Sequence, residues 1–314
     1  MIFFTPYMND WRHQVGTAPE RYQVYDTEDK EMNKAYEEIT NQIISQLQQG
    51  QIPWTKPWFG AQSVISYATG RPYSILNQML LGDEAGEYIT WHQIQEQGGH
   101  LKKGCKGRKI YLWKTIEKTE TTRDGEIIKK QVPYLRSFVV FKIADCDGIQ
   151  PRWQPKASNS TASPIESAEN TIHQYLSREK INLIHKKIES YYSVKHDHIN
   201  IPEITYFRSA ESYYSVLAHE AIHSTGAETR LSRFRLKDKD DQFGSEKYSR
   251  EELVAEMGSA FLLHHLGIDS SKTLKQNAAY IQNWLEALKN DTNMVVVAAT
   301  RAEKAVQYIL TNNK

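Results

Sequence analysis

The sequence contains the segment Val216-Leu217-Ala218-His219-Glu220-Ala221-Ile222-His223-Ser224-Thr225-Gly226, and the rest of the chain can be interpreted from it. Its centre has the pattern H-E-x-x-H. In an α-helix, residues four positions apart lie about 40° apart around the axis, so His219 and His223 project from one face. Two histidines in this geometry typically bind zinc, and Glu220 beside them can serve as general base for an attacking water. The pattern therefore predicts a zinc-dependent hydrolytic site.

The residues around this pattern predict that it lies on a helix. Ser209 can cap the start of the helix, and Thr225-Gly226 can end it. Apolar residues recur between them at helical spacing, namely Tyr213, Val216, Leu217 and Ile222. The alternative is an ordinary helix with two surface or core histidines, because three fixed positions can match by chance in a chain with 11 histidines.

A third metal ligand is expected further along the chain, because a catalytic zinc normally has three protein ligands and one open position. The next strongly helical segment, residues 248–263, contains three glutamates. Glu252 and Glu256 are four residues apart on one face, and Glu251 is expected on the exposed face. We assign Glu252 as the third ligand and Glu256 as a carboxylate that hydrogen-bonds a ligand histidine. The order within this pair stays open.

Length and composition describe a folded chain of about two domains. The chain has 314 residues, of which 39% are apolar and 11% aromatic, so it can bury a substantial core. The 39 lysines and arginines nearly cancel the 38 aspartates and glutamates. Overall charge therefore predicts neither a nucleic-acid-binding protein nor an acidic DNA mimic, and any electrostatic footprint must be local.

The sequence predicts a cytoplasmic protein with no membrane partner. No apolar run is long enough to cross a bilayer, and Met1–Phe4 lack the basic region that a signal peptide requires. Cys105 and Cys146 are the two cysteines, which argues against a disulfide framework and fits a reducing compartment. Without a C-x-x-C pattern, zinc would have to use histidine and carboxylate ligands.

Two features of the N-terminal half predict contact with single-stranded DNA. The segment 50–58 holds Trp54, Lys56 and Trp58 in a stretch stiffened by two prolines, which favours stacking on unpaired bases; the alternative is that both tryptophans are core. A glycine-punctuated loop follows later, in a stretch without acidic residues between Gln97 and Ile116, and suits a phosphate backbone. A solvated charge run is the alternative there. The basic residues of the loop are Lys102, Lys103, Lys106 and Arg108.

Several of these segments, taken together and in order, resemble the ArdC-type antirestriction proteins of conjugative plasmids and other mobile elements. The N-terminal matches are residues 50–58, 70–77, 89–93 and 99–104, and the C-terminal matches are 213–226, 230–231 and 248–263. The resemblance covers roughly residues 33–312. It does not include the first 30 residues, 118–134 or 154–164. Ser224 stands where the family often has an aromatic residue.

The resemblance implies a bacterial, cytosolic protein that protects incoming DNA. It implies an N-terminal single-stranded-DNA-binding domain and a C-terminal zincin-like metallopeptidase domain. The matched N-terminal motifs also add Arg71, Tyr73, Asn77 and Trp91 to the residues expected to contact DNA.

We therefore predict an α+β fold of two domains, an N-terminal α/β DNA-binding module and a gluzincin-like C-terminal domain. Within it we expect an outlying hairpin at residues 118–134 and an edge strand at Ile199 and Ile201 that lines the cleft. The predicted parts are an N-terminal extension (1–31), the DNA-binding domain (32–150), a linker (151–164) and the metallopeptidase domain (165–314).

The predicted function is that of an antirestriction protein that binds single-stranded DNA and carries a zinc-dependent peptidase site for an unknown protein or peptide substrate. The first alternative is a non-enzymatic single-stranded-DNA-binding protein whose zinc site is structural or vestigial. The second is a regulatory protease whose N-terminal domain recognises a protein.

Overall fold

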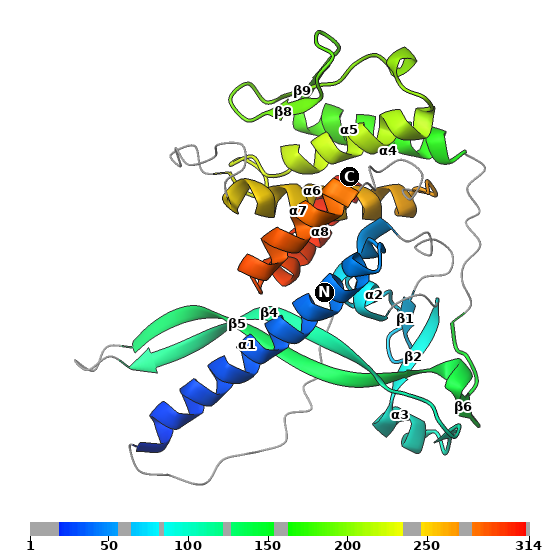
Figure 1. Cartoon of the computed structure of the whole chain (residues 1–314), viewed down its shortest axis with the longest axis vertical. Coiled ribbons are helices and arrows are strands. Elements are labelled where there is room, and N and C mark those ends of the chain that lie inside the picture. The colour runs from blue at the N-terminus through cyan, green and yellow to red at the C-terminus, as the bar shows by residue number, and fades with distance from the viewer. Residues whose placement is uncertain are drawn as a thin grey trace.

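Figure 1 shows the computed structural model of the chain. The structure describes residues 19–55, 64–81, 85–121, 127–153, 163–234, 246–269 and 278–311. A mostly β N-terminal part lies at one end of the molecule and a mostly helical C-terminal part at the other. This arrangement confirms the predicted two-domain α+β fold.

A long helix, α1 (Pro19–Gln48), opens the described chain and runs obliquely along the N-terminal part (Figure 1). Its first turns lie within the predicted N-terminal extension, where the sequence shows no clear period. Tyr36, Ile39, Ile43 and Leu47 are buried at helical spacing and face the core. The chain turns away at Gly50, whose φ of 75° is readily adopted only by glycine.

The N-terminal part is built on a four-stranded sheet. The strands, in spatial order, are β1 (Val64–Ser66), β2 (Gly86–Thr90), β5 (Ile127–Lys142) and β4 (Arg108–Thr121). The pair β1 and β2 is parallel, and the other pairs are antiparallel. Strands β4 and β5 pair from Arg108 with Val140 to Thr121 with Ile127. This long ribbon confirms the arms of the predicted hairpin, whose turn lies outside the described residues.

Helices cover both faces of this sheet. On one face, Leu81 of α2 (Ile75–Leu81) packs with Tyr88 and Val140. On the other, Ile94 of α3 (Trp91–Glu96) packs with Ile89. Helix α3 begins with a capping box between Thr90 and Gln93. Shorter elements complete this part, namely the helices η1 (Pro53–Thr55) and η2 (Ile143–Asp145) and the paired strands β3 (His100–Leu101) and β6 (Cys146–Asp147).

In its described residues, the C-terminal part combines five α-helices and one short 3-10 helix with a small sheet. The elements are α4 (Pro164–Glu179), β7 (Asn182–Ile184), β8 (Tyr191–Ser193), β9 (His198–Asn200), η3 (Ile204–Tyr206), α5 (Ala210–Ser224), α6 (Glu246–His265), α7 (Ala278–Asn290) and α8 (Met294–Leu310). Helix α6 packs between α5 and α8. Within the described part of the chain, no helix has the length and hydropathy needed to span a membrane.

The predicted position of the edge strand is wrong. Strand β9, which contains Ile199, is the central strand of the order β7-β9-β8, and Ile199 is fully buried. Strands β7 and β8 are the two edge strands, because each of them pairs with β9 alone among the described strands. The isoleucines at 199 and 201 therefore belong to a buried strand and to the residues that continue it into the core. They do not belong to a strand with one face in a cleft.

One apolar core runs across the predicted domain boundary. It joins residues of α1, η1 and α2 to residues of α4 through α8. Trp54 of η1 is fully buried, and its ring meets the ring of Trp284 on α7 edge to face, with 6.1 Å between the ring centroids. The two parts are therefore held together by side-chain packing, because a large desolvated indole stabilises the contact.

Candidate metal centre

Helix α5 presents the H-E-x-x-H residues to a cleft. The predicted cap forms, because the Ser209 side chain accepts a hydrogen bond from the backbone N–H of Ser212. The Nε2 atoms of His219 and His223 lie 3.1 Å apart. Glu220 is buried, with 7% of its surface exposed, and lines the same cleft. The helix thus places the two imidazoles side by side, as the spacing predicts, and Glu220 lines the same cleft.

Glu252 of α6 completes a three-residue cluster. Its two carboxylate oxygens lie 3.4 Å from His219 Nε2 and 3.3 Å from His223 Nε2. In the described part of the chain, this is the one group of three or more potential ligands whose donor atoms all lie within 4.8 Å of one another. In a tetrahedral site with metal–ligand distances of about 2.0–2.2 Å, neighbouring ligand atoms are about 3.3–3.6 Å apart. The donor set therefore fits one metal ion.

Glu251 is not on the exposed face where the sequence places it. Its carboxylate lies 3.5 Å from His223 Nδ1, and its side chain is only 13% exposed. Arg233 donates hydrogen bonds to both Glu251 oxygens and a further one to the Ile222 carbonyl. Helix α6 is covered by α5 and α8 together, so a wider arc of it is buried than the sequence pattern predicts. Glu251 is thus the carboxylate that holds the second nitrogen of a predicted ligand histidine.

Glu256 has a different environment from the one predicted. No hydrogen bond between Glu256 and a ligand histidine is present among the described side chains, and its Oε2 atom is buried without a hydrogen-bond partner. Burial raises the pKa of Glu256, although the nearby His219 acts in the opposite direction. Within the predicted pair of glutamates, it is Glu252 that contacts both histidines.

The charges of this cluster shift the pKa values of its histidines and of Glu252 in opposite directions. Burial lowers the pKa of His223, but the hydrogen bonds and charges of Glu251 and Glu252 outweigh burial and raise it to about 10. Burial raises the pKa of Glu252, but the two histidines outweigh it and hold that pKa well below its usual range. A metal ion that binds here must therefore displace protons from the imidazoles.

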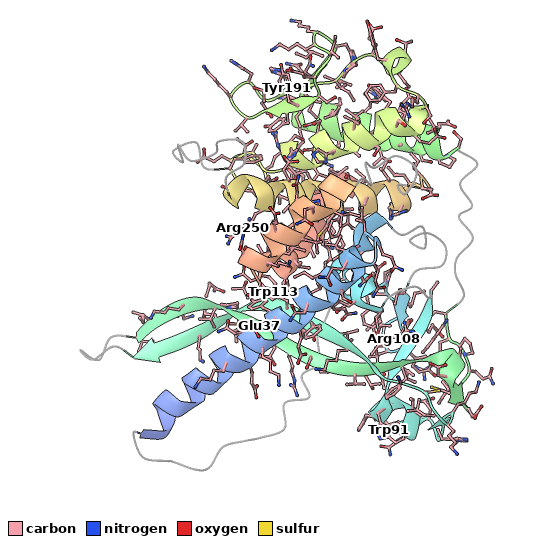
Figure 2. All side chains as sticks on the ribbon, viewed as in Figure 1. Glu37, Trp91, Arg108, Trp113, Tyr191 and Arg250 are labelled. Atoms are coloured by element: carbon pink, nitrogen blue, oxygen red, sulfur yellow. The ribbon has the colours of Figure 1, made fainter. Side chains whose placement is uncertain are left out.

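A cleft of about 1050 Å³ opens beside the cluster. Its walls come from β8, the segment 231–234 and helices α5, α6 and α8. Figure 2 labels two of the lining residues, Tyr191 on β8 and Arg250 on α6. The ring of Tyr192 on β8 stacks on Phe234, with 6.4 Å between the ring centroids. An elongated substrate can thus lie between the edge strand and the two helices that carry the cluster.

A buried arginine connects strand β8, which forms one wall of the cleft, to helix α5, which carries the two histidines. Arg230 has a side chain only 2% exposed, and its Nε donates to the carbonyl of Ser224 at the end of α5. Its Nη atoms donate to the carboxylate of Asp197 and the hydroxyl of Tyr192. These bonds place the β8–β9 turn at a set distance from His223, because charge-assisted hydrogen bonds of a planar guanidinium allow little rotation.

The residues predicted to contact DNA do not share one environment. Trp54 is fully buried, so its ring has no free face on which a base could stack. The Asn77 side chain is buried and bonded to both the backbone N–H and carbonyl of Tyr111, which joins α2 to β4. Tyr73 is half-buried beside the sheet core. Lys56 and Trp58 lie outside the described residues. Burial of Trp54 follows from its packing on α7, which is distant in sequence.

Other predicted contacts lie on the surface. Trp91 is 47% exposed, and its ring meets Phe141 edge to face at 6.5 Å. Gly107, at the end of the basic loop, approaches the same Phe141 so closely that an added Cβ would lie 3.1 Å from its ring. The exposed aromatic ring and the basic loop therefore adjoin.

The basic residues predicted to contact DNA differ in exposure and in the hydrogen bonds that they make to the rest of the protein. Arg71, Lys103 and Lys106 are exposed. The Lys102 ammonium donates to the carbonyl of Ala144 at 2.8 Å, and the half-buried Arg108 donates to the carbonyl of Leu81. Figure 2 shows Trp91 at the opposite end of the molecule from Tyr191.

Two family models match the chain. Residues 33–141 match the N-terminal domain of the anti-restriction factor ArdC, and residues 170–301 match a zincin-like metallopeptidase domain. The fold and the cluster on α5 and α6 thus define a protein with an ArdC-type N-terminal domain followed by a zincin-like domain.

Whole-chain relatives agree with this class. The protein y4eC of Sinorhizobium fredii, described as uncharacterized, is 30% identical over 289 residues, which are 87% of this chain and 91% of y4eC. The DNA primase TraC of Escherichia coli is 31% identical over 297 residues, but these are only 27% of TraC.

Two solved structures cover nearly the same length. The metal-free antirestriction protein ArdC from plasmid R388 is 32% identical, with a TM-score of 0.65 over 87% of this chain and 96% of that one. Its Mn(II)-bound form is 30% identical, with a TM-score of 0.66 over 89% of this chain and 99% of that one. This chain belongs to the ArdC family of antirestriction proteins.

Proposed function

We propose that this chain is a zinc-dependent peptidase. Its N-terminal part binds single-stranded DNA and so keeps the peptidase on the DNA. The observation that carries the proposal is the convergence of His219, His223 and Glu252 beside buried Glu220, in a cleft with a strand edge along one wall. An extended peptide can pair with the edge of β8 and so present its backbone to the cluster.

The residues of the cluster have separate roles in this proposal. His219, His223 and Glu252 hold the metal, and Glu251 fixes the ring of His223. When bound, the metal polarises a peptide carbonyl and makes water easier to deprotonate. Glu220 takes the proton from the attacking water and delivers it to the nitrogen of the departing amine. Burial of Glu220 excludes competing solvent from this transfer.

Zinc is the metal that the donor set supports best. Two imidazoles and one carboxylate at tetrahedral spacing are a usual catalytic zinc set, whereas manganese prefers more oxygen ligands. The Mn(II)-bound form of the R388 protein makes metal identity a necessary measurement. Metal analysis of the full chain, purified without chelator, is expected to give one zinc per chain.

The first experiment compares Glu220→Gln with His219→Ala. The Glu220→Gln variant is expected to keep its metal and lose hydrolysis of a peptide library, because only the proton carrier is removed. The His219→Ala variant is expected to lose both. Wild-type rates of cleavage in Glu220→Gln would exclude Glu220 as the general base.

Binding of single-stranded DNA is proposed for the surface formed by Trp91 and the exposed lysines Lys103 and Lys106. The support is an exposed ring that adjoins a basic loop, since stacking and phosphate contacts together bind unpaired strands. Arg71 and Lys102 are proposed as further phosphate contacts.

The free thiols Cys105 and Cys146 agree with action in the reducing cytoplasm.

The double variant Lys103→Ala/Lys106→Ala tests this surface. We expect weaker binding to an unstructured oligonucleotide and a smaller salt dependence, because fewer counterions are released. Lys289→Ala on α7 is the matched control, since this lysine is exposed on the other part of the molecule. Equal affinity and salt dependence in both variants would rule the loop out.

A further inference from the structure

Among the described residues that line the cleft beside the metal cluster, cationic side chains outnumber carboxylates. Four of its lining residues are cationic, and two of them are paired: Arg233 with Glu251, and Arg250 with Asp291. The other two are Arg301 and Lys304, three residues apart on α8 and therefore on one face. No carboxylate is found within ion-pair distance of either among the described residues.

The surroundings of Arg301 show that this charge is concentrated on one wall. Its side chain reaches solvent, yet burial against the cleft lowers its pKa. The charges of Arg233 and Arg250 lower it further, and among the described groups Glu251 acts in the opposite direction. Three guanidiniums thus line one cleft, and together they attract a bound anion more strongly than a single charge would.

This cationic wall is connected to the metal cluster through Glu251. The carboxylate that lies 3.5 Å from His223 Nδ1 pairs at 2.8 Å with Arg233, which lines the same cleft as Arg301. Both groups line one cleft, and the edge strand β8 forms part of the same cleft. A peptide held along β8 can therefore reach the metal cluster with its backbone while a side chain or its terminus meets α8.

We propose that Arg301 and Lys304 select peptides that carry a carboxylate, either an aspartate or glutamate side chain or a free C-terminus. The inference rests on the proposed peptidase function of this cleft. A peptide fits better than a DNA strand, because the edge of β8 lines the cleft and can pair with a peptide backbone. In addition, the proposed DNA surface at Trp91 lies at the other end of the molecule (Figure 2).

The test uses the zinc-loaded full chain and three fluorescent peptide pools that share one randomised composition. One pool has internal glutamate and an amidated end, one has glutamine in its place, and one has glutamine with a free C-terminus. Cleavage by the wild type is followed by mass spectrometry, and binding is measured by anisotropy with Glu220→Gln. Each measurement is repeated in Arg301→Gln/Lys304→Gln and in the control Lys289→Gln, after metal content is checked.

We expect either carboxylate-bearing pool to be preferred over the amidated glutamine pool by about tenfold, the usual effect of a charge-assisted hydrogen bond. The preferred pool identifies a side chain or a terminus as the source. The preference is expected to vanish in the double variant and persist in the control. Equal cleavage of all pools would overturn this inference and leave the peptidase function intact.

Two further outcomes separate the proposals. If no pool is cleaved, the peptidase function is wrong, and the anisotropy data decide the carboxylate site by themselves. Binding that depends on charge and on Arg301 and Lys304 would support it, and equal binding of all pools would overturn it. If single-stranded DNA displaces peptide from the wild type but not from the double variant, the cleft is a DNA path and the inference is wrong.

Discussion

The metal cluster and the proposed DNA surface were predicted from the same sequence with different outcomes. In the cluster, the three residues predicted as ligands lie within one group of donor atoms. On the DNA surface, predicted neighbours separate, because Trp54 is buried in the core while Trp91 is exposed. Metal ligation needs particular donor atoms at a particular spacing, whereas tryptophan and lysine serve many purposes. Residue type and spacing together are therefore informative at the cluster, and residue type alone is not.

The largest expected effect separates the two glutamates of α6. Glu252→Ala is expected to lower zinc affinity more than about 100-fold, beyond the loss typical of an indirect partner, and to abolish hydrolysis. Glu256→Gln is the matched control, because Glu256 has no hydrogen bond to either predicted ligand histidine among the described side chains. Zinc titration against a chelator measures both. Retained zinc in Glu252→Ala together with loss in Glu256→Gln would reverse the assignment.

The next largest effect is a difference in stability between alanine variants of Trp54 and Trp91. Trp54→Ala is expected to destabilise the protein by about 3–5 kcal/mol, because a fully buried indole leaves a cavity at the junction with α7. Trp91→Ala is expected to change stability by less than about 0.5 kcal/mol, since it lies on the surface, but to weaken DNA binding.

Urea unfolding and oligonucleotide affinity, measured on both tryptophan variants, decide the contrast. A folded, stable Trp54→Ala variant that has lost only DNA affinity would place Trp54 on the DNA surface after all.

A smaller effect is expected at Glu251. Glu251→Gln is expected to lower zinc affinity by about 10–100-fold, because it removes the charge that lies beside His223 Nδ1 without removing a ligand. Glu251→Asp is expected to recover part of this loss. Since Glu251 also pairs with Arg233, thermal unfolding of the metal-free variants separates loss of metal from loss of fold. Unchanged zinc affinity would show that the contact does not orient His223.

The smallest effect concerns a histidine on α6 that is not part of the cluster. Burial lowers the pKa of His264 to about 4, against opposing effects of Asp269 and the Ala260 backbone. As the pH falls, His264 is therefore protonated in the unfolded chain before it is protonated in the folded protein. The stability that neutral His264 contributes is lost as the pH falls below the pKa of His264 in the unfolded chain. Between pH 7 and pH 5.5 this loss is about 1 kcal/mol.

Urea unfolding of wild type and His264→Gln at both pH values measures the difference. The variant is expected to lose less stability on acidification than the wild type. Equal pH dependence would show that His264 titrates normally.

The sequence by itself determined the H-E-x-x-H helix, its cap at Ser209 and the arms of the β4–β5 hairpin. Each of these depends on residues close together along the chain, where spacing and hydrogen bonding are nearly independent of the rest of the fold. The family resemblance identified the order of the two domains.

The tertiary structure alone decided the remaining features. It buried Trp54 against α7, placed β8 rather than β9 at the edge, and turned Glu251 toward His223. It also gathered Arg301 of α8 and Arg250 of α6 on one wall of the cleft. These outcomes depend on which helices pack together across long stretches of sequence, and such packing determines which arc of a helix is buried and which charged side chains come together.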